Sequence, residues 1–190
     1  MENERLIQFI TQVLPVSEAT ATTIASHFEP LQIQKNEFLL REGQMNDRYF
    51  FVADGFLRAF TYDTEGNDIT TGFYTPNQMA FEVSSFFLRE PSKENIRALS
   101  DCSGSYITYG QLQVLFHTIP EFREFGRAIL VRGFIAFKQR TLSLIRETAE
   151  TRYANLLQAR PEIVQHVPLK YIASYLGMTD TSLSRIRAQK

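Results

Sequence analysis

The sequence predicts an α+β protein: an N-terminal antiparallel β-roll or jelly roll with flanking helices, then a long helix, then a small helix-turn-helix domain. Three observations lead to this fold class. Short β-branched and aromatic segments, punctuated by glycine and proline, fill residues 31–107. A stretch of about 27 residues without a helix breaker follows Pro120. Two short amphipathic segments hinged at Gly177 end the chain.

The composition is that of a globular chain, since 44% of the 190 residues are hydrophobic and 13% are aromatic. Cys102 is the only cysteine, which excludes an intramolecular disulfide framework and a cysteine-rich zinc or iron–sulfur site, and we interpret it as a core thiol. The opening MENERLIQFITQVLP lacks the basic start and continuous apolar core of a signal peptide, and no apolar run approaches membrane-spanning length. We therefore expect a cytoplasmic protein with no metal and no membrane partner.

The chain is expected to open with two short helices. Apolar residues recur at helical spacing over residues 4–14, and Pro15 stops the run. Ser17 is a typical N-cap for a second helix that extends to His27, with Ile24 and Phe28 facing inward.

The strand-rich region that follows should form a compact antiparallel roll. Segments such as FLLREG, RYFFVADGFLRAFTYD and DITTGFYTP have the composition of closely spaced strands. The segment YDTEGNDI lies between two of them and predicts a hairpin in which Gly66 or Asn67 supplies a positive φ.

The long helix after Pro120 carries two apolar stripes. One comprises Phe122, Phe125, Ile129 and Ala136, and the other comprises Gly126, Leu130, Gly133, Phe137 and Leu144. One interpretation is a central helix buried within a monomer. We prefer a helix that packs one face on the roll and the second stripe on its twin in a homodimer, with the glycines permitting close approach.

The tail is predicted to be a helix-turn-helix. Leu169, Ile172, Ala173 and Leu176 form one buried stripe, and Gly177 ends that helix as a C′ residue. Thr179 then caps a second helix that begins at Asp180, with Met178 and Leu183 positioned as a hydrophobic staple. Leu183 and Ile186 face the first helix, which turns Thr181, Ser184, Arg185 and Ala188 outward, with Ser182 and Arg187 at the flanks.

This outward surface suits double-stranded DNA. Residues 151–190 carry six Lys and Arg against two Asp and Glu, a net charge of +4, whereas the rest of the chain carries −5. A helix fits the major groove, and an Arg fork matches guanine O6 and N7. The candidate DNA-binding residues are Lys170, Thr179, Thr181, Ser182, Ser184, Arg185 and Arg187. We expect Arg185 to read a base, while Lys170 and Arg187 hold phosphates. The alternative is a ligand-sensing or scaffold module whose tail binds protein.

An enzyme is not expected. His27, His117 and His166 are scattered over different elements, and neither a nucleophile motif nor a Gly-rich phosphate loop is present, so no catalytic residue is assigned.

The ordered set of motifs resembles the Crp/Fnr family of bacterial transcription regulators over nearly the whole chain. The features shared with its cyclic-nucleotide-binding roll are REG at residues 41–43, Gly55 after YFFVADG, and the acidic hairpin at Glu65–Gly66. The resemblance implies a sensor domain at residues 1–120, a dimerisation helix at 121–149 and a DNA-binding domain at 150–190. It also implies a homodimer that reads a pseudo-palindromic operator, and RNA polymerase as a partner.

Departures from the family pattern weaken the expected phosphate grip. The family's Phe-Gly-Glu turn reads Ala-Phe-Glu here, with Phe81 in place of the glycine and Glu82 retained. Ser92 and Lys93 replace the Arg-led pair that holds the cyclic phosphate in the family. Lys93 or Arg97 could still attract an anion; the alternative is that each is a solvated surface cation. We expect cyclic AMP to bind poorly or not at all. The pocket is then either filled by aromatic residues such as Phe81, Phe86 and Phe87 or suited to an unknown apolar effector.

Two further departures concern the tail and the sensor. The four-cysteine sensor of the Fnr branch is absent. Arg185 matches the family's base-reading Arg, but Asp180 and Thr181 replace the Arg and Glu of the best-known members, so the operator sequence should differ. The given sequence stops at Lys190, so we expect no full β-hairpin wing within it: either the wing is dispensable or the given sequence is truncated.

Overall fold

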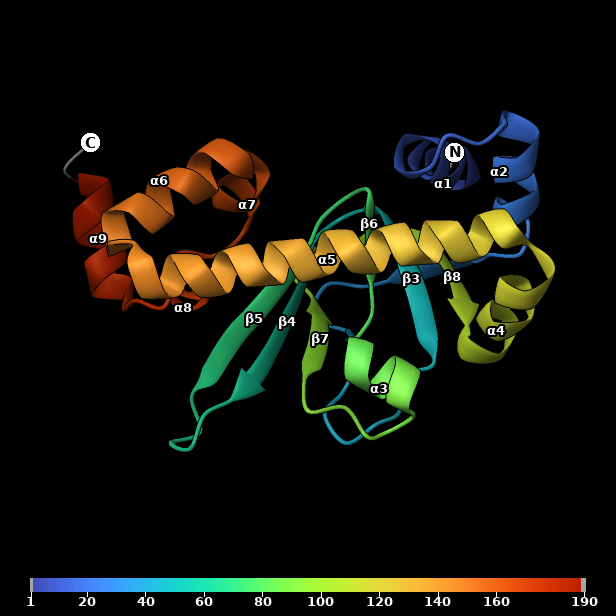
Figure 1. Cartoon of the computed structure of the whole chain (residues 1–190). Helices are drawn as coiled ribbons and strands as arrows, with labels where there is room; N and C mark the ends of the chain where they lie inside the picture. Colours follow the sequence, from blue (N-terminus) through green and yellow to red (C-terminus); the bar gives the residue numbers. More distant parts are fainter. Residues whose placement is uncertain (1, 189–190) are drawn as a thin grey trace.

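The computed structural model describes residues 2–188 (Figure 1). Two helices open the chain, α1 (Glu2–Val13) and α2 (Glu18–Ala25). Ser17 caps α2, because its hydroxyl accepts a hydrogen bond from the Thr20 N–H at 3.1 Å. Ile24 and Phe28 are buried, as the sequence predicted.

The centre of the molecule is a roll of two four-stranded antiparallel sheets. The first sheet has the order β1-β8-β3-β6 and the second has the order β2-β7-β4-β5. The strands are β1 (Glu29–Ile33), β2 (Phe38–Leu40), β3 (Arg48–Asp54), β4 (Leu57–Tyr62), β5 (Asp68–Tyr74), β6 (Gln78–Ala80), β7 (Asn95–Ala98) and β8 (Cys102–Thr108). Apolar side chains such as Phe50, Val52, Leu57 and Ile96 fill the roll's own core. The predicted antiparallel roll is confirmed.

The β4–β5 hairpin has the predicted glycine turn. Gly66 has φ +85°, a conformation that glycine adopts without a steric penalty. The Asp63 carboxylate accepts the N–H groups of Glu65 at 2.9 Å and Asn67 at 2.8 Å, which fixes the hairpin tip.

Helices α3 (Val83–Leu88) and α4 (Tyr109–Thr118) precede the long helix α5 (Pro120–Arg146), whose 27 residues match the predicted stretch. Its first turns are held on the roll, because Phe122 and Phe125 are fully buried in a core shared with α1, α2 and α4. The rest of α5 runs across the molecule to the tail helices (Figure 1).

The tail contains four helices in the described residues. They are α6 (Ala149–Ala159), α7 (Pro161–His166), α8 (Leu169–Tyr175) and α9 (Asp180–Ala188). Thr148 caps α6, close to the expected domain boundary at residue 150. Within residues 2–188, no helix combines the length and apolarity needed to cross a bilayer.

A buried arginine joins the roll to the tail. Arg58 on β4 is fully buried, and its guanidinium donates to the Asp68 carboxylate and to the Thr70 hydroxyl, both at 2.8 Å. The guanidinium of Arg58 also stacks on Tyr171 of α8, whose ring centroid lies 3.8 Å from the guanidinium carbon. The hydrogen bond from Arg58 lowers the pKa of Asp68, and the charges of Arg58, Lys170 and Arg97 act in the same direction.

Further contacts extend this junction along the outer strand β5. The Thr70 N–H donates to the Ser174 hydroxyl at 2.8 Å, and Arg140 of α5 donates to the carbonyls of Thr70 at 3.3 Å and Tyr175 at 3.0 Å. The rings of Phe73 and Tyr175 pack with centroids 5.1 Å apart. The tail therefore covers the free edge of β5, which would otherwise expose unpaired backbone groups.

Arg58→Met should lower the free energy of unfolding by about 2 kcal/mol, because charge-assisted hydrogen bonds are lost while the volume is roughly kept. The loss is moderated because the Asp68 side chain is 43% exposed and can regain water. Urea denaturation of the whole chain measures it. Arg123→Met, at an exposed position of α5, is the control and should change the value by less than about 0.5 kcal/mol. Equal effects of the two substitutions would contradict the assigned role of Arg58.

Candidate functional site

The turn between α8 and α9 is fixed by its backbone. Gly177 has φ +65° and follows the last residues of α8. Its N–H donates to the Ser174 carbonyl at 3.1 Å, and the Met178 N–H donates to the Ala173 carbonyl at 3.0 Å, which is the Schellman pattern. Thr179 then caps α9 by accepting the Ser182 N–H at 3.2 Å. The predicted helix-turn-helix geometry is present.

The outer face of α9 is open to solvent. Leu183 and Ile186 are buried against the other tail helices. The exposed candidates are Thr179, Thr181, Ser184, Arg185 and Arg187, whereas Ser182 is half-buried and its hydroxyl lies 2.9 Å from that of Thr179. The basic groups Arg185 and Arg187 have no carboxylate partner among the described residues. Their guanidinium donors are therefore available to an external acceptor.

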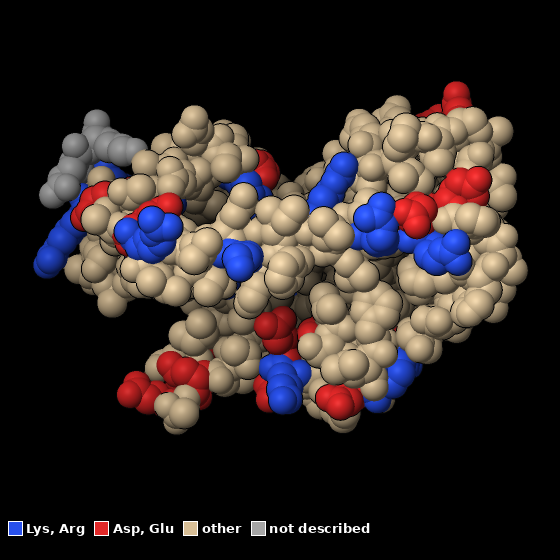
Figure 2. Space-filling model, viewed as in Figure 1, with Lys and Arg blue, Asp and Glu red and all other residues tan. Residues whose placement is uncertain are grey.

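Lys170 lies apart from this group. Its ammonium is 4.8 Å from the Tyr171 ring centroid, and its charge contributes to the lowered pKa of Asp68 on the roll. Lys170 thus faces the junction with β5 as well as solvent. In Figure 2 the tip of the β4–β5 hairpin, next to this junction, carries Asp and Glu side chains.

The residues expected to form an effector pocket are engaged in structural roles. The Glu82 carboxylate caps α3, since it accepts the N–H groups of Ser84 at 2.9 Å and Ser85 at 2.6 Å. Phe81 is buried, with its ring 4.6 Å from that of Tyr49 and 5.7 Å from that of Phe86. The aromatic residues of this turn therefore pack on one another.

The three polar candidates are likewise dispersed. Ser92 is buried in a local turn, where its hydroxyl donates to the Glu94 carbonyl at 2.8 Å. Lys93 is exposed. Arg97 points toward the tail and donates to the Tyr171 hydroxyl at 3.1 Å. This contact directs the Arg97 guanidinium to the junction between the roll and the tail, and whether Lys93 or Arg97 attracts an anion stays a prediction.

Glu94 is a neighbouring residue that the sequence pattern did not single out. Burial raises the pKa of its carboxyl group, and the charge of Glu82 raises it further. The charges of Glu82 and Glu94 act on each other, and neither carboxyl group can serve as a cationic partner for an anion. In the sequence Glu94 is only the polar residue that follows Ser92 and Lys93. Its partial burial becomes visible only in the folded structure.

The apolar stripe predicted to form the dimer interface on α5 is only partly exposed to solvent. Gly126 is buried in its own chain, where a Cβ would lie 2.6 Å from the Phe116 ring, and Leu130 packs partly on the same core. Gly133, Phe137 and Leu144 are exposed, although Leu144 also approaches Gly177. The large apolar side chains that face solvent on α5 are Val131, Phe134, Ile135, Phe137, Leu142, Leu144 and Ile145. Sequence reasoning missed Phe134 and Ile145, which are 66% and 75% exposed.

Comparison with known proteins covers both parts of the chain. Residues 30–118 match the cyclic nucleotide-binding domain family. The transcriptional activator protein anr of Pseudomonas aeruginosa is 27% identical over 165 residues, covering 81% of this chain and 67% of that protein, and FnrA of Stutzerimonas stutzeri gives the same values. The structure of FixK2 from Bradyrhizobium japonicum aligns with a TM-score of 0.73 at 18% identity, covering 85% of this chain and 83% of that one. CLP from Xanthomonas campestris aligns with a TM-score of 0.72 at 17% identity, covering 91% of both chains. In both of its parts the chain is similar to transcriptional regulators of the Crp/Fnr type.

Proposed function

We propose that the chain is a DNA-binding transcriptional regulator that acts in the cytoplasm as a homodimer, with RNA polymerase as a further partner, and that it is not an enzyme. The observation that carries the proposal is the α8–α9 unit, whose capped second helix presents Arg185 and Arg187 unpaired on an open face. Within the described residues, no group of three or more His, Cys, Asp or Glu is arranged to hold a metal. The relatives named as transcriptional activators support the same function.

The exposed face of α9 has positions suited to contacting a DNA base and positions suited to contacting backbone phosphates. Arg185 lies in the middle of the exposed face and has the forked donors that match the major-groove edge of guanine. Arg187 lies at the flank near the end of α9, where a backbone phosphate is the expected partner. The free N–H groups at the start of α9, next to the Thr179 hydroxyl, suit a second phosphate.

Arg185→Ala should weaken binding to the operator by about 1–3 kcal/mol and leave binding to random DNA nearly unchanged, because only the operator offers the matched base. Arg187→Ala should weaken binding to both DNAs and flatten the dependence of log K on log salt by about one unit. Fluorescence anisotropy over a salt series measures both, with operator fragments selected by the protein from genomic DNA. An equal loss on both DNAs for Arg185→Ala would remove its reading role. Binding that does not depend on salt would favour the protein-binding alternative.

The homodimer is proposed from the solvent-facing side of α5. Seven large apolar side chains lie exposed along one helix, and Figure 2 shows that the front of α5 is mostly uncharged between separate Lys and Arg side chains. A contiguous apolar surface of this kind marks an interaction site. A second α5 related by a two-fold axis would cover it with the same residues.

Phe134→Glu should convert the dimer to a monomer, because it places a charge from each protomer in the proposed interface. Phe134 is 66% exposed in the single chain, so the substitution should leave the monomer's stability nearly unchanged. Gln8→Glu adds the same charge at an exposed position of α1, outside α5, and should stay dimeric. Sedimentation equilibrium at micromolar concentration decides, and a monomeric wild-type protein that still binds the operator would refute the assignment.

We also propose that the roll does not take a cyclic nucleotide at the family's position. A cyclic phosphate must leave water, and only a paired cation and convergent N–H groups offset that cost. Here Glu82 already accepts the N–H groups of α3, Arg97 is bound to Tyr171, and Glu94 adds a repelling carboxyl group.

Titration calorimetry with cyclic AMP and cyclic GMP should therefore give no saturable heat in the micromolar range. The same preparation titrated with operator DNA is the control for active protein. A dissociation constant in the low micromolar range or tighter would mean that Lys93 or a rearranged Arg97 holds the phosphate, contrary to this proposal.

A further inference from the structure

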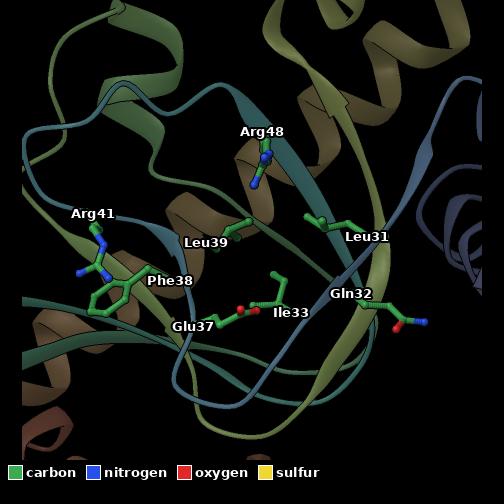
Figure 3. Close-up of a pocket in the computed structure, with 8 residues that line it drawn as sticks. All are labelled: Leu31, Gln32, Ile33, Glu37, Phe38, Leu39, Arg41 and Arg48. Atoms are coloured by element: carbon green, nitrogen blue, oxygen red, sulfur yellow. The ribbon is translucent and has the colours of Figure 1, made fainter.

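A groove of about 740 Å³ separates the end of α5 from the tail helices. Its lining residues lie within 136–147, 152–160 and 175–176, which belong to α5, α6, α8 and their C-caps. The depression shown in Figure 3 is of a different kind, because all of its lining residues, from Leu31 to Arg48, belong to the roll. Open space therefore lies between α5 and the tail, and the polar contacts that cross it carry much of the connection.

Arg152 of α6 joins the ends of two other helices. Its Nε–H donates to the carbonyl of Leu176, the C-cap of α8, at 2.8 Å. Its Nη1 donates to the carbonyl of Glu147, the C-cap of α5, at 2.7 Å. A helix C-terminus has carbonyls without intrahelical partners and the negative end of the helix dipole, and both favour a cation. The guanidinium has enough donors, in a fixed fork, to serve both helix ends at once.

The last carbonyls of α8 are held by arginines from two helices. The turn after α8 already uses the carbonyls of the two residues before Tyr175. The Tyr175 carbonyl accepts a hydrogen bond from Arg140 of α5 at 3.0 Å, and the Leu176 carbonyl accepts the one from Arg152. These two residues directly precede Gly177, where the chain turns toward α9. The chain is therefore held to α5 and α6 immediately before the turn.

The other end of this bridge is also fixed. Glu147 has an extended backbone, with φ −113° and ψ 150°, so α5 ends there and the chain bends into α6. Its carboxylate accepts hydrogen bonds from the Ser143 hydroxyl of α5 and, at 3.1 Å, from Nδ2 of Asn155 on α6. The bend between α5 and α6 and the turn between α8 and α9 are thus linked through the side chain of Arg152.

We propose that Arg152 is a positioning residue for DNA recognition, which contacts no DNA but sets the orientation of α9 relative to α5. The inference rests on the proposed function, in which α5 joins two protomers and each α9 enters a major groove. The spacing of the two half-sites is then a geometric property of the dimer. Arg58 holds α8 to the roll, whereas Arg152 holds it to α5, the helix through which the protomers would meet. Loss of Arg152 should therefore broaden the spacing that the dimer accepts.

Arg152→Gln should weaken binding to the selected operator by at least about tenfold, because charge-assisted hydrogen bonds to two helix ends are lost. The dependence of log K on log salt should stay the same, because no phosphate contact is removed. Binding to random DNA, which needs no fixed spacing, should change by less than about threefold. Arg146→Gln is the matched control: this guanidinium, in the last turn of α5, is exposed and has no hydrogen bond or ion pair among residues 2–188. Its removal should leave all three values unchanged.

Operators with one base pair inserted or removed between the half-sites measure the orientation of α9 more directly. The wild-type protein should bind each of them at least about tenfold more weakly, because one base pair shifts a half-site along and around the duplex. Arg152→Gln should discriminate by less than about threefold, and Arg152→Lys, which keeps a cation between the helix ends, should restore most of the discrimination. Each ratio is measured on one preparation, so it does not depend on the fraction of a variant that is folded.

An Arg152→Gln variant with the wild-type spacing preference would overturn the inference. A smaller salt dependence would also overturn it, because Arg152 would then be a phosphate ligand, and so would an equal loss of affinity on operator and random DNA. In these cases the wild-type protein still binds its operator, and the proposed function stands. Wild-type protein that binds no DNA, or binds it without a spacing preference, would instead refute the proposed function and this inference with it.

Discussion

The charge of Arg58 constrains how the two ends of this protein meet. A guanidinium cannot lose its proton at any physiological pH, so a folded chain that buries one must surround it with acceptors and aromatic faces. Here β5 supplies Asp68 and Thr70, and α8 supplies Tyr171. If the tail moved away, one side of the buried charge would lose its partner. The position of α8, and of α9 packed against it, therefore depends on Arg58 of the roll.

The same junction engages a residue that the sequence analysis assigned to an effector pocket. Arg97 lies on β7, a few residues after Ser92 and Lys93, yet it is turned toward Tyr171 of the tail. The carboxylate of Glu82 is engaged by the N–H groups of α3. Side chains that hold structure in place are costly to release for a ligand, because each would leave an unpaired polar group behind.

The sequence predicted the fold class, the long helix and the caps at Ser17, Gly177 and Thr179, because each depends on residues within a few positions of one another. It did not predict the junction, because those partners are remote in sequence. Arg97 and Tyr171 are 74 residues apart, and Thr70 and Ser174 are 104 apart. The solvent-facing apolar stripe of α5 also differs from the predicted one, because Gly126 and Leu130 pack on the chain's own core. Periodicity shows that two stripes exist, but Phe116 of α4 decides that Gly126 faces inward.

The length of α5 gives the molecule a mechanical property. Its 27 residues span about 40 Å as a single rod, anchored on the roll by Phe122 and Phe125 at one end and meeting the tail near Leu144 at the other. A tilt of about 5° about the first anchor displaces the far end by about 3.5 Å, which is close to the rise of one DNA base pair. Arg140, bonded to both β5 and α8, lies along the part of the rod that such a tilt would swing. The helix therefore has the geometry of a lever arm, and in the proposed dimer the stiffness of its side supports would set how well the two α9 helices align with successive grooves of DNA.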